Sequence, residues 1–417
     1  MFSILRNTSF RMAWLSYTTS SAATSITPII LTLFLLDSYG GIGALGLVLG
    51  TRTLGFVGGA ILGFGMIDDL PRRRTMIIAS LVRGIAIITA IIIFDHSILA
   101  ICITVFFAGM GEGIFRGAYQ SLIAEVIEES QLQQANALST FSNRFLLVVS
   151  PAMATIVYAW IGGSLSLLVI GLLWLFSMVL ANTLPKREAK VSIKSKTRVP
   201  FKSFGEVFVE VSRHRWFIGG LTGLVVWLTL GYAIQQLTLP VITRDVFGND
   251  TFIGFALGSY SLGALIAALW LAKSKPRLPG LIAFIGLSMY GLVPLALVVL
   301  DVSHHLGALF VLLAFFLGGL GIEAFNIPWF SAIQREMPQD KMGRIFSLDF
   351  TISYGIAPLG LVFLPYFITT FGQNNVLLIC GLLTIASALI ILLVPGALRL
   401  SDPRYQKGDK RLNNIER

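Results

Sequence analysis

The decapeptide GLVLGTRTLG at residues 46–55 recurs as GFALGSYSLG at residues 254–263. Both copies fit the pattern G-x-x-L-G-[ST]-x-[ST]-L-G, and their offset is half of the 417-residue chain. A second pair follows at matching places, with FFAGMGEGIF at 106–115 and FFLGGLGIEAF at 315–325. Repeats at a half-chain offset predict two similar halves in parallel orientation, and their small residues predict close contacts between helices.

The composition is that of a membrane protein. Hydrophobic residues make up 55% of the chain and charged residues only 12%, whereas soluble domains carry about 25% charged residues. The net charge of +10 does not indicate a nucleic-acid partner. The basic residues form short clusters between apolar runs, not one folded face interleaved with aromatic residues.

Twelve apolar runs are long enough to cross a bilayer as helices, for which about 20 residues are needed. The expected fold is therefore an all-α membrane protein with twelve transmembrane helices in two parallel, pseudo-symmetric six-helix halves. The expected spans are residues 11–37, 43–66, 75–94, 98–120, 136–160, 164–184, 216–243, 251–272, 279–300, 307–331, 346–371 and 376–398.

The basic residues predict the orientation of the chain. All 31 Lys and Arg residues except Arg52, Arg83, Arg116, Arg144 and Arg244 lie in the termini or in loops that follow even-numbered spans. Basic loops remain in the cytoplasm, so both termini are expected there. The expected divisions are an N-terminal half (1–184), a cytoplasmic connecting loop (185–215), a C-terminal half (216–398) and a cytoplasmic tail (399–417).

The stretch GFGMIDDLPRRR at residues 63–74 places charges between spans 2 and 3. Asp68 ends one span, and Arg72 and Arg73 precede the next. An acid at this point pairs with a nearby arginine or faces the positive N-terminus of a neighbouring helix, which makes it a candidate conformational latch. The alternative is ordinary positive-inside flanking, which explains the arginines but not the acids.

This charged stretch resembles the loop signature of the major facilitator superfamily, G-x-x-x-D-R-x-x-R-R. Asp68 stands for the acid of the signature, but Asp69 replaces the arginine that follows it. The stretches FRMAW (10–14), AEVIEESQLQQANAL (124–138) and GRIFSLDFTISYGIAPLG (343–360) resemble the branch that contains macrolide-efflux proteins and the enterobactin exporter. The resemblance implies a secondary transporter that works by alternating access, an exporter driven by a proton gradient, and a working monomer.

Ionisable residues inside membrane spans are costly and are therefore candidates for function. Glu112 and Arg116 lie four residues apart in the fourth span and share a helix face. Glu112 is the first candidate proton carrier, with Arg116 as its partner, and the alternative is a permanent structural ion pair. Glu323 in the tenth span is the second candidate carrier.

The other embedded charges allow several interpretations. Arg52 and Arg144 are candidates to attract an anionic substrate, or else they pair internally or extend toward the membrane interface. Arg83 is interpreted as a structural partner of the cytoplasmic loop, with Asp68 as the candidate acid. Asp349 opens the eleventh span, where the helix dipole alone accounts for an acid.

Two spans are too polar to face lipid on all sides. The first carries SYTTSSAATSIT at 16–27, and the seventh carries aromatic residues with two adjacent amides. Aromatic rings with a few amides suit a broad amphipathic ligand, whereas hydroxyls alternatively bond to their own helix backbones. The substrate-cavity candidates, together with Arg52 and Arg144, are Tyr17, Ser21, Trp227, Tyr232, Gln235, Gln236, Asn326 and Trp329.

No pattern in the sequence indicates an enzyme, a metal site or a cofactor. A nucleotide-binding P-loop is absent, so ATP is not the expected energy source. His304 and His305 lie near Asp301 without a clear metal pattern and are interpreted as solvated loop residues, and Cys102 and Cys380 as small buried residues. The expected partners are a small-molecule substrate, protons and the lipid bilayer.

Three functions stay open at this point. The first is proton-coupled export of hydrophobic or amphipathic drugs from a bacterium, across its cytoplasmic membrane. The second is export of one endogenous product such as a siderophore, whose acidic groups would favour Arg52, Arg116 and Arg144. The third, a non-transporting membrane sensor or scaffold, is disfavoured by the retained membrane acids.

Overall fold

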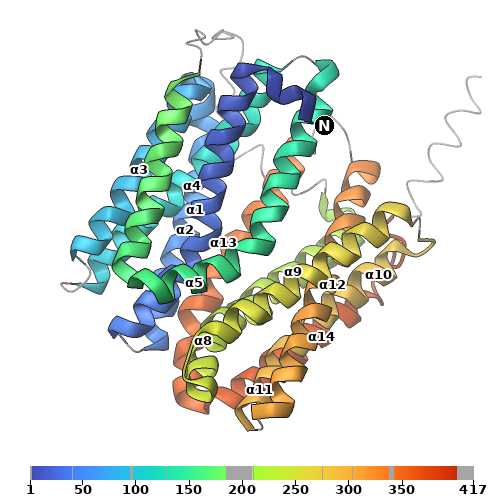
Figure 1. The fold of residues 1–417 in the computed structure, drawn as a ribbon. Coiled ribbons are helices and arrows are strands. Elements are labelled where there is room, and N and C mark those ends of the chain that lie inside the picture. Colours follow the sequence, from blue (N-terminus) through green and yellow to red (C-terminus); the bar gives the residue numbers. More distant parts are fainter. Residues whose placement is uncertain are drawn as a thin grey trace, which may run out of the picture. The chain divides into compact units, whose positions relative to one another are not determined.

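The structure is a computed structural model. It describes residues 2–39, 41–93, 97–127, 129–184, 209, 211–274, 276–302, 304–337 and 342–401, apart from some side chains within helices. These residues contain helices and no strand, so the expected all-α fold is confirmed (Figure 1). The elements are η1 (Phe2–Arg6), α1 (Thr8–Tyr39), α2 (Ile42–Asp69), α3 (Arg72–Ile93), α4 (Ile98–Val126), α5 (Glu129–Asn182), α7 (Arg215–Val226), η2 (Trp227–Tyr232), α8 (Ala233–Phe247), α9 (Thr251–Lys273), α10 (Pro279–Met289), α11 (Leu292–Val302), α12 (His304–Glu336), α13 (Met342–Phe371) and α14 (Gln373–Ile391).

By length and composition, the described residues contain 11 helices able to cross a membrane. One of them, α5, is 54 residues long, which corresponds to about 80 Å at the rise of an α-helix and is far longer than one crossing of a bilayer core. Its Gly162 has a φ of 75°, outside the helical region. Because glycine adopts this conformation without steric cost, the chain turns here, and α5 supplies the two expected spans at 136–160 and 164–184.

Two spans of the second half of the chain are built from shorter pieces. The seventh, Arg215–Phe247, consists of α7, one π-helical segment η2, and α8. The ninth, Pro279–Leu300, consists of α10 and α11, which meet at Tyr290 and Gly291. A π-helical segment inserts an additional residue into a helical turn and often marks a functional site.

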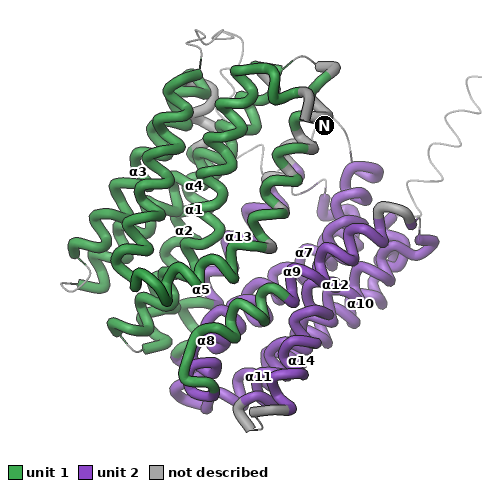
Figure 2. Tube along the Cα trace, viewed as in Figure 1, with its two compact units in different colours: residues 1–198, 247–258, 361–365 green, residues 199–246, 259–360, 366–417 purple. Residues whose placement is uncertain are grey.

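The chain divides into two compact units (Figure 2). Unit 1 comprises residues 1–198, 247–258 and 361–365, and unit 2 comprises residues 199–246, 259–360 and 366–417. Unit 1 therefore holds α1 to α5. Unit 2 holds α7, η2, α10, α11, α12, α14, nearly all of α8, and most of α9 and α13.

The repeated motifs pack against each other inside unit 1. A Cβ atom on Gly55 of α2 would collide with the backbone carbonyl of Phe106 on α4. Gly109 on α4 meets the carbonyl of Arg52 on α2 in the same way. These glycines let the two helix backbones touch and thereby fix their register.

Unit 2 repeats this arrangement with the second copies of both motifs. Gly263 on α9 contacts the carbonyl of Phe316 on α12, and Gly319 on α12 contacts the carbonyl of Tyr260 on α9. The contacts make Tyr260 the counterpart of Arg52, whose carbonyl accepts the matching contact in unit 1. The close helix contacts expected from the repeated glycines are thus present in both units.

Candidate functional site

An ion pair joins α2 and α4 inside unit 1. The Nη2 atom of Arg52 donates to Oε2 of Glu112 at 2.5 Å, and the two side chains are only 14% and 19% exposed. The pair forms because Gly109, three residues before Glu112, lies against the backbone of Arg52. The helix contact therefore determines which residue of α2 faces the acid.

Arg116 lies one turn beyond Glu112 on α4 and is exposed. The sequence spacing indicated Arg116 as the partner of Glu112, but the structure pairs Glu112 with Arg52 instead. The spacing rule compares residues of one helix only. The rule therefore cannot predict a partner on another helix, such as Arg52 on α2, which reaches the same acid where the two helices touch at a glycine.

Arg83 is a second cation near this ion pair. Its side chain is only 1% exposed, and its guanidinium carbon lies 4.5 Å from the ring centre of Phe115 and 5.2 Å from that of Trp174. It donates to the Ala79 carbonyl and to the Ser80 hydroxyl. The Arg83 side chain also lies against Gly111, the residue that precedes Glu112 on α4. A second, buried arginine therefore lies close to the residue that carries the ion pair.

The contacts of Arg83 lie within the helices of unit 1, and its expected partner Asp68 has a side chain outside the described set. Of the predicted latch residues, Arg73 donates to the backbone and side-chain oxygens of Asn182 at 2.5 and 2.6 Å. Arg72 donates to the Leu70 carbonyl at 3.4 Å. Arg73 therefore ties the start of α3 to the end of α5, and the latch stays a prediction.

Polar residues of α1 bond both to their own helix and to neighbouring helices. Tyr17 stacks on Tyr119, with ring centres 4.0 Å apart, and the Ser21 carbonyl accepts a hydrogen bond from Ser25. Trp14 donates to Ser142 at 3.0 Å. Only part of the polarity of span 1 is therefore explained by local backbone bonds. The side chain of Arg144 lies outside the described set.

An aromatic and amide cluster surrounds the π-helical segment in unit 2. The Trp227 ring centre lies 5.9 Å from that of Tyr232 and 5.4 Å from that of Tyr290, and Tyr260 lies 6.2 Å from Tyr290. The indole N–H of Trp227 is buried without a hydrogen-bond partner among the described residues. A buried donor without a partner requires an explanation, and an acceptor on a ligand that reaches this cluster would supply one.

The two predicted amides of this cluster have different positions. Gln235 is buried and accepts a hydrogen bond from the Tyr290 hydroxyl at 2.9 Å, whereas Gln236 donates to the Tyr232 hydroxyl at 2.8 Å and is half-buried. Sequence reasoning missed Tyr260 and Tyr290. Tyr260 occupies the place of Arg52 in the repeat, and this correspondence was the available signal, whereas Tyr290 had none.

The predicted residues of span 10 are buried to different extents. Glu323 is 4% exposed and Asn326 is half-buried. Trp329 is fully buried among aromatic rings and donates its indole N–H to Asp349 on α13 at 3.3 Å. This position favours a packing role for Trp329 over direct contact with a substrate.

The interpretation of Asp349 as a helix-dipole residue is wrong. The helix α13 begins at Met342, and its first turn contains no acid. Asp349 therefore lies about two turns inside the helix, whereas dipole stabilisation falls off within the first turn.

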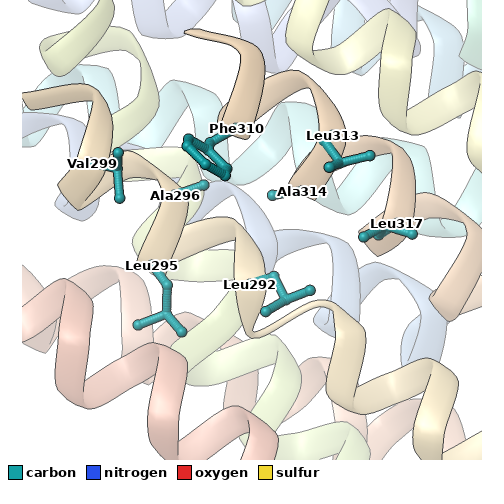
Figure 3. A pocket seen from close by; sticks show the side chains of 8 residues that line it. All are labelled: Leu292, Leu295, Ala296, Val299, Phe310, Leu313, Ala314 and Leu317. Atoms are coloured by element: carbon teal, nitrogen blue, oxygen red, sulfur yellow. The ribbon is translucent and has the colours of Figure 1, made fainter. Parts of the chain in front are cut away.

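An apolar cavity lies between α11 and α12 (Figure 3). Its volume is about 210 Å³, and only Leu, Ala, Val and Phe side chains line it. No side chain of this lining orients a polar ligand, so the cavity is a poor match for the predicted substrate site. Among the residues that the structure describes, no group of three His, Cys, Asp or Glu side chains is placed to hold a metal ion.

Comparisons with known proteins agree with this architecture. The family model of the Major Facilitator Superfamily matches residues 13–361. Macrolide efflux protein A of Streptococcus pyogenes is 23% identical over 356 residues, which cover 81% of this chain and 84% of that protein. The protein of the same name from Enterococcus faecalis is 23% identical over 334 residues, which cover 76% of this chain and 99% of that protein.

Solved structures share the fold at much lower identity. The nucleoside transporter NupG has a TM-score of 0.77 and 11% identity, and the match covers 92% of this chain and 98% of that chain. A D-xylose–proton symporter has a TM-score of 0.73 and 12% identity, and the match covers 95% of this chain and 99% of that chain. At these identities the likeness shows the fold alone.

Proposed function

Because this chain belongs to the major facilitator superfamily, a family of membrane transporters and not of enzymes, we propose that it exports hydrophobic or amphipathic small molecules in exchange for protons. The export is by alternating access, in which the substrate site opens first to one side of the membrane and then to the other. The names of the two macrolide-efflux relatives support this direction of transport and this class of substrate.

The observation that carries the proposal is the Arg52–Glu112 ion pair inside unit 1. Separating two embedded charges is costly unless each finds a new partner. A proton on Glu112 removes one charge of the pair and so removes much of that cost. Release of the Arg52 side chain from Glu112 is in this way coupled to proton binding while the two helix backbones keep their register, with Glu323 as the second carrier and Arg116 as a further cation near the path.

The proposed substrate contacts in unit 2 come from the cluster around the π-helical segment. Trp227, Tyr232, Gln235 and Gln236 supply apolar rings together with a few polar groups, which suits a large amphipathic ligand such as a macrolide. The hydrogen bond from Tyr290 holds Gln235 in place. In unit 1, Tyr17 and Ser21 of α1 are the corresponding candidates, and Asn326 completes the set in unit 2.

One observation favours the second candidate function, export of an endogenous anionic product such as a siderophore. In unit 1, Arg52 pairs with Glu112. The buried Arg83 lies against Gly111, next to that acid, with a carbonyl and a hydroxyl oxygen as its hydrogen-bond acceptors. An anionic substrate group would compensate the additional positive charge. Secretion of a siderophore under iron limitation, lost on deletion of the gene, would support this candidate.

The proposed location is the cytoplasmic membrane of a bacterium, with both termini in the cytoplasm and a monomer as the working unit. The basic loops support the orientation, because such loops remain in the cytoplasm. Asp68, Arg72 and Arg73 then lie on the cytoplasmic side, where they act as the latch.

Accumulation of erythromycin and ethidium in pump-deficient bacteria tests the proposed function. Cells that express the chain should accumulate less of each compound than control cells, and a protonophore should abolish the difference. A Glu112→Gln variant at equal membrane abundance should behave like the control. Accumulation equal to that of control cells for every compound would contradict export of hydrophobic molecules.

A further inference from the structure

Asp349 is a buried acid in unit 2 to which the proposed coupling assigns no role. It lies on α13 with a side chain that is 6% exposed. Its Oδ1 atom accepts a hydrogen bond from the indole N–H of Trp329 on α12 at 3.3 Å. Trp329 is itself fully buried, so the contact lies in the interior of the unit.

Aromatic rings surround the indole that contacts this acid. The Trp329 ring centre lies 5.2 Å from that of Phe217, 5.4 Å from that of Phe325 and 5.6 Å from that of Trp216. Gly220 on α7 leaves room for the indole ring, because a Cβ atom there would collide with it. The indole N–H is therefore held toward Asp349 by packing on three rings.

The described charged and titratable groups of the neighbouring helices do not pair with Asp349. On α12, Glu323 lies six residues before Trp329, and Arg335, six residues after it, donates to Glu336 and to the Leu400 carbonyl. At the start of α7, His214 is buried beside Trp216, with ring centres 6.3 Å apart, and Arg213 and Arg215 are exposed. Among the described residues, no Arg, Lys or His pairs with Asp349, whose polar contact is Trp329.

The surroundings of the two acids Glu112 and Asp349 therefore differ in one decisive respect. The positive charge of Arg52 compensates the charge of Glu112 at 2.5 Å, whereas the polar contact of Asp349 is the neutral indole N–H of Trp329. A buried charge without a cation beside it is costly, and a carboxyl group avoids that cost when it carries a proton. An indole N–H can donate to the carboxyl group in either protonation state, so the contact survives the gain and the loss of a proton.

We propose that Asp349 is a proton-binding group of the transport cycle, held in place by Trp329. The inference rests on the proposed proton coupling and adds a second proton site in unit 2, at which no cation pairs with the acid among the described residues. Asp349 lies near the start of the span expected at residues 346–371, at the end that the basic loops assign to the cytoplasm. It is thus placed to exchange its proton with the cytoplasm, while Glu112 serves the deeper part of unit 1.

The test compares wild type and Asp349→Asn as purified full-length protein in proteoliposomes, with radiolabelled erythromycin as the probe. The amide keeps the size of the side chain and an acceptor oxygen for Trp329, but it binds no proton at neutral pH. Accumulation driven by an imposed pH gradient should fall by about tenfold or more. Erythromycin counterflow without a gradient should stay within about twofold of wild type, because substrate exchange does not require net proton movement.

Ser353→Ala is the matched control, because Ser353 lies one turn further on α13, is buried and has no hydrogen-bond partner for its hydroxyl among the described residues. It should leave both transport readouts unchanged. Asp349→Glu retains a titratable carboxyl group and should keep gradient-driven accumulation, with a shifted dependence on pH. This variant also tests the inference if Asp349→Asn does not reach the membrane.

Gradient-driven accumulation by Asp349→Asn at the wild-type level would overturn the inference, as would an unshifted pH profile for Asp349→Glu. Equal loss of accumulation and counterflow in well-folded Asp349→Asn would assign Asp349 to packing and would also overturn it. If wild type shows counterflow but no gradient-driven accumulation, proton coupling itself fails, and the inference fails with it. Only this last outcome is visible in the wild-type protein, so the two failures are distinguishable.

Discussion

Arg52 and Glu112 form an ion pair at 2.5 Å between two helices whose backbones touch at Gly109. Gly109 lies three residues before Glu112 on α4, so the glycine contact sets the helix register in which the ion pair forms. Tyr260 occupies the place of Arg52 in unit 2, where Gly319 makes the equivalent contact. Both halves of the repeat therefore keep the glycine contact between the helices, but a charged arginine in unit 1 is replaced by a neutral tyrosine in unit 2.

The ion pair predicts strong coupling between two substitutions. Glu112→Gln leaves the largely buried Arg52 without its acid and should lower the free energy of unfolding by about 3 kcal/mol. The double variant Arg52→Gln with Glu112→Gln removes both charges and should be less destabilised than the sum of the single variants. Thermal unfolding of the purified proteins in detergent measures this, and simple additivity would show that the pair contributes no mutual stabilisation.

The glycine contacts predict opposite behaviour for two positions of α2. Gly55→Ala places a methyl group against the carbonyl of Phe106, and overpacking of this kind costs about 1–3 kcal/mol. Gly58→Ala meets no atom within 4 Å and should be neutral or slightly stabilising. Membrane abundance and thermal unfolding of the two variants report the difference. Equal stability of the two would contradict the close approach of α2 and α4.

The aromatic contacts of Arg83 predict that lysine cannot replace it. Its guanidinium carbon lies near the rings of Phe115 and Trp174, and a compact ammonium group stacks less well on such rings. Arg83→Lys should lower stability by about 1–2 kcal/mol, whereas Arg74→Lys, on the exposed start of the same helix, should have little effect. Unchanged unfolding of Arg83→Lys would show that charge alone is needed there.

The cluster around the π-helical segment predicts a separation of stability from ligand binding. Tyr290→Phe removes the donor to the buried Gln235 and should cost about 1–2 kcal/mol of stability. Trp227→Phe removes an N–H group that has no partner among the described residues, so it should cost less stability but weaken the binding of erythromycin. Thermal unfolding and equilibrium binding in detergent measure both effects. Erythromycin binding by Trp227→Phe equal to that of wild type would remove Trp227 from the substrate contacts.

Sequence patterns located the spans and the repeat well, because a bilayer requires long apolar runs and close helix packing requires small residues. The two runs around Gly162 were separated correctly, and the structure shows the turn between them. The family signature at 63–74 and the match to residues 13–361 agree, so the predicted family membership is confirmed.

The partners of the embedded charged residues could not be predicted from the sequence. Spacing within one helix suggested Arg116 for Glu112, but the register between α2 and α4 presents Arg52. The contact between Trp329 and Asp349 likewise joins two helices, and nothing in either helix alone indicates it. The π-helical segment at Trp227–Tyr232 was also not predicted, and its Gly231 packs against Tyr290 and Thr384, which lie far away in the sequence.

Proton movement caused by the substrate tests the central claim most directly. Inside-out membrane vesicles that contain the chain would be given an acidic interior, and erythromycin would be added while a fluorescent probe reports the internal pH. Exchange of substrate for protons predicts that erythromycin makes the interior less acidic and that Glu112→Gln vesicles show no response. Erythromycin entering the wild-type vesicles with no change of internal pH would contradict proton-coupled export.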